Sequence, residues 1–99
     1  MIITGGLNVY PAEVENLLYT YPNVQEGIVF AIPDAKRGAV IGAAVVPRPG
    51  SKIVEKGLLA FLRANLANFK VPDRIVVREA LPRTSSGKTI RDAETLLAT

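Results

Sequence analysis

The stretch LPRTSSGKT, at positions 81–89, has a residue spacing that suggests chemistry. Gly87, Lys88 and Thr89 match the end of the phosphate-loop pattern G-x-x-x-x-G-K-[ST], in which backbone N–H groups and the lysine bind phosphates. The pattern requires glycine at position 82, but Pro82 stands there and removes one backbone N–H. Only ten residues follow Thr89, whereas a phosphate loop precedes further strands of a parallel sheet. We therefore reject a phosphate loop here.

TSSG is instead a run of turn-forming residues that presents Lys88 at or near the surface. A lysine carries a compact cation on a long, flexible stem, so Lys88 could reach a phosphate or carboxylate in a neighbouring cavity. Taken alone, however, Gly87-Lys88 favours an exposed lysine without a specific role.

The available residue types limit the chemistry further. The 99 residues include no histidine and no cysteine, which excludes disulfides, cysteine metal ligands and catalytic pairs that need histidine. We expect no metal site made by this chain, and the lack of cysteine is compatible with a cytoplasmic protein. The apolar runs are too short to span a bilayer, so we expect no membrane span.

The net charge of +3 is unevenly distributed along the chain. Residues 70–91 contain six basic and two acidic side chains, which suits either a solvated basic face or a surface that meets phosphates. Phe69 is the one aromatic residue beside this segment, so we do not expect it to bind nucleic acid.

The N-terminal part of the chain predicts a strand or loop edge at MIITGG, followed by a helix over residues 11–22. Pro11 suits the first position of that helix, and Glu13 and Glu15 lie near the positive end of its dipole, so we interpret both glutamates as structural. The apolar face of this predicted helix comprises Val14, Leu17, Leu18 and Tyr21.

The middle of the chain predicts two neighbouring antiparallel strands, over 24–34 and 39–50, joined by a polar loop. Their almost continuous apolar character indicates a sheet that helices cover on at least one face. A third strand is predicted over 75–77.

Two more helices complete the prediction. One covers about 54–66, and a weak one covers 90–98, with Ile90, Ala93 and Leu97 on its apolar face. The order helix–strand–strand–helix–strand–helix predicts one α+β domain over residues 1–99, with a small three-stranded sheet flanked by helices.

Two distant stretches, MIITGGLNVYPAEVENLL and FKVPDRIVVREALPRTSSGKTIR, together resemble the C-terminal domain of the AMP-forming acyl-CoA synthetases. The segment IPDAKRGAVIGAAVVPRPGS is similar to the middle strands of that family, so the resemblance covers essentially the whole chain. It implies a mobile cap domain that belongs to a longer enzyme. The N-terminal domain, which binds ATP and the acyl group, would lie outside these residues.

The resemblance implies two sites that are used in turn. Lys88 matches the family's adenylation lysine, which stabilises the negative charge that gathers as acyl-adenylate forms from ATP and pyrophosphate leaves. Gly5 and Gly6 match the glycine stretch that lines the tunnel for the pantetheine arm of coenzyme A (CoA), and Gly6 is the better match. ATP and CoA would be co-substrates, with Mg²⁺, all bound together with the N-terminal domain.

Further residues match less specific family positions. Phe69, Lys70 and Arg74 resemble the region that can contact the CoA nucleotide, although Phe69 also suits a role at the edge of the core. Arg91 matches a basic position after the lysine, with a supporting or surface role.

Three hypotheses follow from the sequence. The first is the cap of an acyl-CoA or aryl-CoA ligase, whose partners are its own N-terminal domain, acyl-adenylate and CoA. The second is the corresponding part of a peptide-synthetase adenylation domain that acts on a carrier protein, and the third is a stand-alone binding module. SSGK favours the ligase over the peptide synthetase. We expect the chain to be inactive alone, because the residues that would surround the ligands of Lys88 are absent from it.

Overall fold

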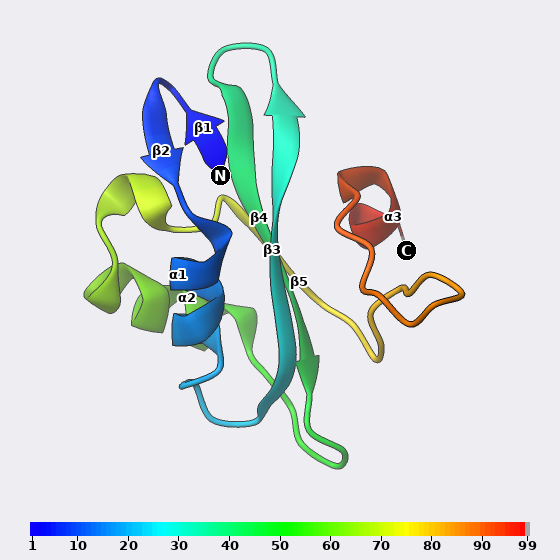
Figure 1. The fold of residues 1–99 in the computed structure, drawn as a ribbon. Coiled ribbons are helices and arrows are strands. Elements are labelled where there is room, and N and C mark those ends of the chain that lie inside the picture. The colour runs from blue at the N-terminus through cyan, green and yellow to red at the C-terminus, as the bar shows by residue number, and fades with distance from the viewer. Residues whose placement is uncertain (99) are drawn as a thin grey trace.

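Residues 1–98, which the computed structural model describes, form a mixed sheet, a separate hairpin and three helices (Figure 1). In chain order the elements are β1 (Ile2–Thr4), β2 (Leu7–Val9), α1 (Pro11–Leu18), β3 (Val24–Asp34), β4 (Gly38–Pro47), α2 (Glu55–Asn65), the 3-10 turn η1 (Asn68–Lys70), β5 (Arg74–Val77) and α3 (Ala93–Leu97). The predicted α+β class is confirmed.

The three-stranded sheet has the order β3-β4-β5. Strands β3 and β4 are antiparallel, as predicted, and pair along most of their length around the polar turn between Asp34 and Gly38. Strand β5 runs parallel to β4, because α2 and η1 carry the chain back to the starting end of β4 before β5 begins. Strands β3 and β5 are therefore the two edges of the sheet.

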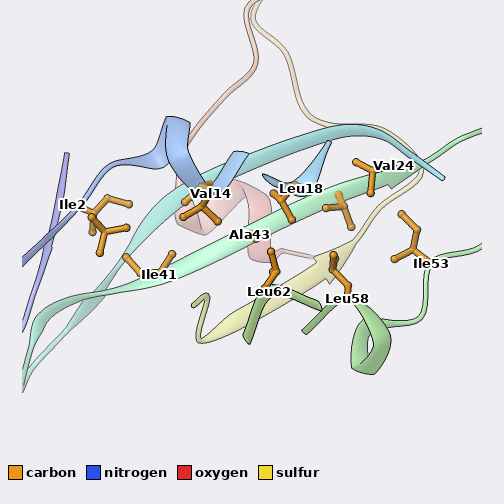
Figure 2. Packing of buried hydrophobic residues seen from close by; sticks show 12 residues of the cluster. Ile2, Val14, Leu18, Val24, Ile41, Ala43, Ile53, Leu58 and Leu62 are labelled. Carbon is orange, nitrogen blue, oxygen red and sulfur yellow. The ribbon is translucent and has the colours of Figure 1, made fainter. Parts of the chain in front are cut away.

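Both faces of the sheet are covered, which explains the almost continuous apolar sequence of β4. Alternate residues of a strand point to opposite faces. Ile41, Ala43 and Val45 point toward α1 and α2, whereas Ala44 and Val46 point toward α3. The first core, shown in Figure 2, contains Ile2, Val9, Val14, Leu18, Val24, Val29, Ile41, Ala43, Val45, Ile53, Leu58 and Leu62.

A second, smaller core lies on the opposite face, between the sheet and the C-terminal segment. It contains Ile28, Phe30, Ala44, Val46, Val76, Leu81 and Leu96. This core holds the segment that carries Lys88 against the sheet, because Leu81 precedes that residue and Leu96 follows it.

The first helix, α1, is shorter than the sequence predicts. Helix α1 ends at Leu18 instead of residue 22, because the hydroxyl of Thr20 donates to the Leu17 carbonyl and Asn23 adopts a left-handed φ of 69°. Tyr21 therefore packs from the following turn, where its ring lies 5.1 Å from that of Phe61 on α2. The second helix agrees with its prediction within one residue.

The last helix is shorter than predicted and presents a partly different face. It begins at Ala93, where Asp92 caps it by accepting hydrogen bonds from the Thr95 backbone N–H and hydroxyl. The fully buried residue is Leu96, whereas Ala93 and Leu97 are only partly buried. The predicted apolar face was therefore right in part: Ala93 and Leu97 border the second core, but the prediction missed Leu96, the residue that the packing buries most.

The hairpin β1–β2 was not predicted as such. Thr4 pairs with Leu7, which leaves Gly5 and Gly6 as a two-residue turn with φ angles of 56° and 83°. Positive φ at both central residues is what a type I′ hairpin turn requires, and glycine adopts it without strain.

Candidate functional site

Lys88 lies in a tight hairpin that closes on itself. The Gly87 N–H donates to the Thr84 carbonyl over 2.9 Å, and the Thr84 N–H donates to the Lys88 carbonyl over 2.8 Å. Gly87 has a φ of 88°, so a turn is followed by a left-handed residue, which is a common three-residue hairpin loop. Arg83 pairs antiparallel with Thr89, and no helix begins until Ala93. This geometry agrees with the rejection of a phosphate loop.

The side chain of Lys88 is free to project from this hairpin. The residue is exposed, and none of the four ion pairs found among residues 1–98 includes it. Its backbone is fixed at both polar groups, because its N–H also donates to the Thr84 hydroxyl over 3.2 Å. The exposed ammonium is therefore carried by a hydrogen-bonded backbone.

Two arginines flank Lys88 and attach its hairpin to β3. Arg83 pairs with Glu26, and its guanidinium also donates to the Gly87 carbonyl and the Thr89 hydroxyl, over 3.3 and 3.0 Å. Arg91 pairs with Glu15 of α1.

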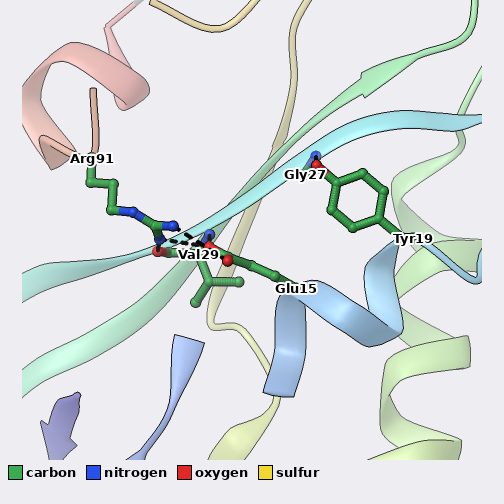
Figure 3. A network of polar contacts seen from close by, with 5 residues as sticks. All are labelled: Glu15, Tyr19, Gly27, Val29 and Arg91. Carbon is green, nitrogen blue, oxygen red and sulfur yellow. Dashed lines mark hydrogen bonds and ion pairs between the residues drawn. The ribbon is translucent and has the colours of Figure 1, made fainter. Parts of the chain in front are cut away.

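Figure 3 shows the Arg91 contacts at the middle of β3. The guanidinium donates to both carboxylate oxygens of Glu15, over 2.6 and 3.3 Å, and to the Val29 carbonyl over 2.9 Å. The same carboxylate accepts the Val29 N–H over 2.8 Å. Glu15 is therefore structural, as predicted, although it acts through the strand edge and Arg91 instead of the helix dipole.

The Gly5–Gly6 turn forms the tip of the β1–β2 hairpin. The Gly5 N–H donates to the Arg37 carbonyl over 3.0 Å, which attaches the tip to the turn between β3 and β4. A Cβ added at Gly6 would meet no atom within 4 Å, and one added at Gly5 would meet only the Arg37 side chain, at 4.0 Å. Within the described residues the turn is thus open on its outer side.

Phe69 and Lys70 lie in η1, which packs beside β2. Phe69 is partly exposed, and the Lys70 ammonium lies 5.6 Å from its ring centroid. That ammonium also pairs with Glu13 over 3.0 Å. Lys70 is therefore partly neutralised, so it is a weaker candidate for a phosphate contact than the sequence suggested.

Arg74 is exposed at the start of β5 and lines a shallow depression with Glu55, Lys56 and Leu59 of α2. The preceding residue, Asp73, pairs with Arg37 over 2.7 Å. Arg74 is thus connected to the hairpin tip through its neighbour Asp73, which pairs with Arg37, whose carbonyl accepts the Gly5 N–H.

The structure thus divides the predicted site residues between two sides of the domain. Contacts link the glycine turn, η1 and the beginning of β5 to one another. The β1–β2 hairpin lies with helices α1 and α2 on one side of the sheet (Figure 1). The loop that carries Lys88 lies with α3 on the other side. Lys88 and the glycine turn therefore face different surroundings.

Sequence reasoning missed the roles of Arg83, Glu26 and Asp73. The carboxylate of Asp73 accepts the Ile41 N–H over 2.9 Å in addition to its pair with Arg37. A signal was present at Glu26, because a lone carboxylate within an apolar strand calls for a partner.

The described residues offer no metal centre, because no three His, Cys, Asp or Glu side chains among them come together. Mg²⁺ is therefore not assigned to any residue of this chain. Within the same residues, no helix is both long and apolar enough to cross a bilayer.

Comparison with known proteins identifies the family. The model of the AMP-binding enzyme C-terminal domain matches residues 13–88, a span that ends at Lys88. The chain belongs to this family. This AMP-binding enzyme C-terminal domain is 50% identical over 91 residues to feruloyl-CoA synthase from an Amycolatopsis species, covering 92% of this chain and 18% of the relative.

This AMP-binding enzyme C-terminal domain also matches a ligase named for a different acid and an ATP-bound crystal structure. Oxalate–CoA ligase from Arabidopsis thaliana is 44% identical over 91 residues, covering 92% of the chain and 18% of the relative. The crystal structure of ATP-bound MatB from Rhodopseudomonas palustris matches with a TM-score of 0.87 and 36% identity, covering 96% of this chain and 19% of that one. The chain spans about a fifth of the length of the relatives it matches.

Proposed function

We propose that this domain is the mobile C-terminal cap of an AMP-forming acid–CoA ligase, and that Lys88 supplies the cation for adenylation. The observation that carries the proposal is the exposed ammonium of Lys88, which stands on a hydrogen-bonded hairpin without an ion-pair partner among the described residues. The named relatives, which are CoA ligases, favour this function over a carrier-protein partner.

In the first half-reaction the acid carboxylate attacks the α-phosphorus of ATP, and pyrophosphate leaves with the electrons of the broken P–O bond. Negative charge gathers on the oxygens around that phosphorus. The Lys88 ammonium would stabilise this charge, and more strongly in a closed cleft from which water is excluded. No proton transfer is needed, so the absence of histidine is no obstacle.

In the second half-reaction the thiol of CoA attacks the acyl carbon, AMP leaves, and the thiol proton is released. We assign the Gly5–Gly6 turn to the passage of the pantetheine arm, because this turn is open on its outer side. Phe69 and Arg74 would lie near the nucleotide end of CoA, with Lys70 reduced to a secondary role by Glu13. The two half-reactions would thus use opposite sides of the domain.

The substrate acid must be selected elsewhere, since relatives of similar identity are named for acids as different as ferulate and oxalate. The proposed acid is therefore any carboxylic acid that the remainder of the full-length protein accepts.

The test uses Lys88→Ala in the full-length protein, first screened for its acid with aromatic, dicarboxylic and fatty acids. We expect ATP–pyrophosphate exchange to fall by about 10²-fold or more, a loss typical of removing one transition-state charge partner. Thioester formation from supplied acyl-adenylate and CoA should stay within a few-fold of the wild-type rate. Lys52→Ala, which removes another exposed lysine, is the control. An equal loss of both half-reactions in Lys88→Ala would contradict the assignment.

A further inference from the structure

We propose that Arg83 and Arg91 are positioning residues, which hold the Lys88 hairpin in place by attaching its two ends to the edge strand β3. The inference rests on the function proposed above for Lys88. It assigns neither arginine to contact with a substrate.

The two attachments bracket Lys88 along the chain and meet the same strand. Arg83 precedes Lys88 by five residues and pairs with Glu26, whereas Arg91 follows it by three and donates to the Val29 carbonyl. Because Glu26 and Val29 are only three residues apart on β3, both ends of the hairpin are fixed against one rigid element.

The Arg91 attachment has the geometry of a specific contact. Arg91 donates hydrogen bonds to both carboxylate oxygens of Glu15, a bidentate arrangement that fixes orientation as well as distance. The Glu15 side chain is only 15% exposed, and its carboxylate also accepts the Val29 N–H. Most exposed ion pairs contribute little, but a largely buried carboxylate that accepts three hydrogen bonds is costly to leave without its partner.

The Arg83 attachment also stiffens the turn itself. Besides its pair with Glu26, the guanidinium donates to the Gly87 carbonyl and the Thr89 hydroxyl, the residues on either side of Lys88. Replacement of Arg83 would therefore loosen the hairpin from within and remove one of its attachments to β3.

The charges of Arg83 and Arg91 are each balanced by a carboxylate, which leaves Lys88 as the available cation of this hairpin. Each guanidinium is paired with one carboxylate, whereas Lys88 is not part of any ion pair within residues 1–98. The carboxylates hold the arginines and do not compete for the ammonium. Electrostatic stabilisation depends on charges that are already placed before the reaction, so a loose hairpin should slow adenylation without preventing substrate binding.

The experiment compares Arg83→Gln and Arg91→Gln in the full-length protein with Arg48→Gln, an exposed arginine that makes no ion pair within the described residues. We expect kcat for adenylation to fall by about tenfold in each of the first two variants, with KM for ATP and the acid within about twofold, since misplacement by an ångström has effects of this order or larger. Hydrogen exchange should accelerate at the amides of residues 84–90, while β4 amides keep their protection and report an intact fold.

A charge exchange tests the pairing directly. Arg83→Glu combined with Glu26→Arg should recover part of the activity that Arg83→Glu loses alone, because the ion pair is restored in the reverse sense. Recovery is expected to be partial, since the exchanged pair lacks the hydrogen bonds to Gly87 and Thr89.

Several results would overturn the inference. The positioning role is excluded if hydrogen exchange at residues 84–90 is unchanged in the arginine variants, or if it accelerates while kcat for adenylation stays the same. It is also excluded if KM for ATP or the acid rises as much as kcat falls, or if the Arg83→Glu/Glu26→Arg exchange recovers no activity. Lys88→Ala is measured in parallel. If Lys88→Ala keeps full adenylation activity, the proposed function fails. If Lys88→Ala loses adenylation activity while the two arginine variants keep theirs, only the positioning role fails.

Discussion

At the scale of single residues, the fit between Gly42 and Phe30 shows how closely the sheet is packed. Gly42 lies in the centre of β4 directly opposite Phe30 of β3. A Cβ added at Gly42 would lie 2.6 Å from two carbons of the Phe30 ring and 3.0 Å from Ile32 Cδ1. The aromatic ring thus occupies the space where a side chain would stand.

We predict that Gly42→Ala destabilises the domain by about 1–3 kcal/mol, because a buried ring that is only 2% exposed has little room to move away. Urea unfolding of the 99-residue chain measures this change. In a Phe30→Leu background the same substitution should cost less, since the ring is gone. An identical cost in both backgrounds would show that the ring is not responsible.

At the scale of elements, the Gly5–Gly6 turn has two separable reasons to be glycine. One is the backbone, since both residues have positive φ, and the other is the open outer surface proposed for the pantetheine arm. Gly6→Leu would violate both requirements at once. Asparagine tolerates left-handed φ much better, so Gly6→Asn isolates the second requirement.

We predict that Gly6→Asn leaves unfolding nearly unchanged and slows thioester formation from acyl-adenylate more than it slows adenylation in the full-length protein. Gly50→Asn is a matched control, because Gly50 also has positive φ, at 76°, and its Cβ would meet no atom within 4 Å. Comparable effects on both half-reactions would argue against the tunnel assignment.

Helix α3 is attached to the sheet through Leu96, which is 1% exposed. Leu96→Ala should cost about 2–5 kcal/mol, the range for a truncated buried leucine. Leu97→Ala should cost less, because that side chain only borders the second core. Urea unfolding of the two variants decides between this packing and the face expected from the sequence, which predicts the reverse order.

These elements also show how far the sequence could lead. The antiparallel pairing of β3 and β4 followed from two apolar runs around a polar turn, and the exposure of Lys88 followed from TSSG. The long-range contacts did not follow. Arg91 and Glu15 are 76 residues apart, so local pattern gives no reason to pair them. Tertiary packing also overrode periodicity in α3, where the Asp92 cap set the start of the helix.

At the scale of the whole molecule, the β1–β2 hairpin and the loop that carries Lys88 lie on different sides of one sheet (Figure 1), so we expect them to meet the substrates in turn. The chain contains no cysteine, so single cysteines can report on each side in a full-length protein whose other cysteines are replaced. Ser85→Cys would mark the Lys88 side and Asn8→Cys the hairpin side, since both positions are exposed.

We predict that ATP with the acid protects Cys at position 85 from maleimide labelling, and that CoA with acyl-adenylate protects Cys at position 8 instead. Rotation of the domain between half-reactions would bury one side while it exposes the other. A cysteine at position 52 should label equally in both conditions. Simultaneous protection of positions 8 and 85 would contradict the alternation.

The contacts around Val29 have a further consequence for how separate molecules behave toward one another. Strand β3 has 11 residues at an open border of the sheet, where free N–H and C=O groups invite a strand from a second molecule to add on. Glu15 and Arg91 occupy both backbone groups of Val29 in the middle of that border. An incoming strand would have to displace a carboxylate and a guanidinium at once, so we expect this ion pair to disfavour the pairing of β3 with a second molecule.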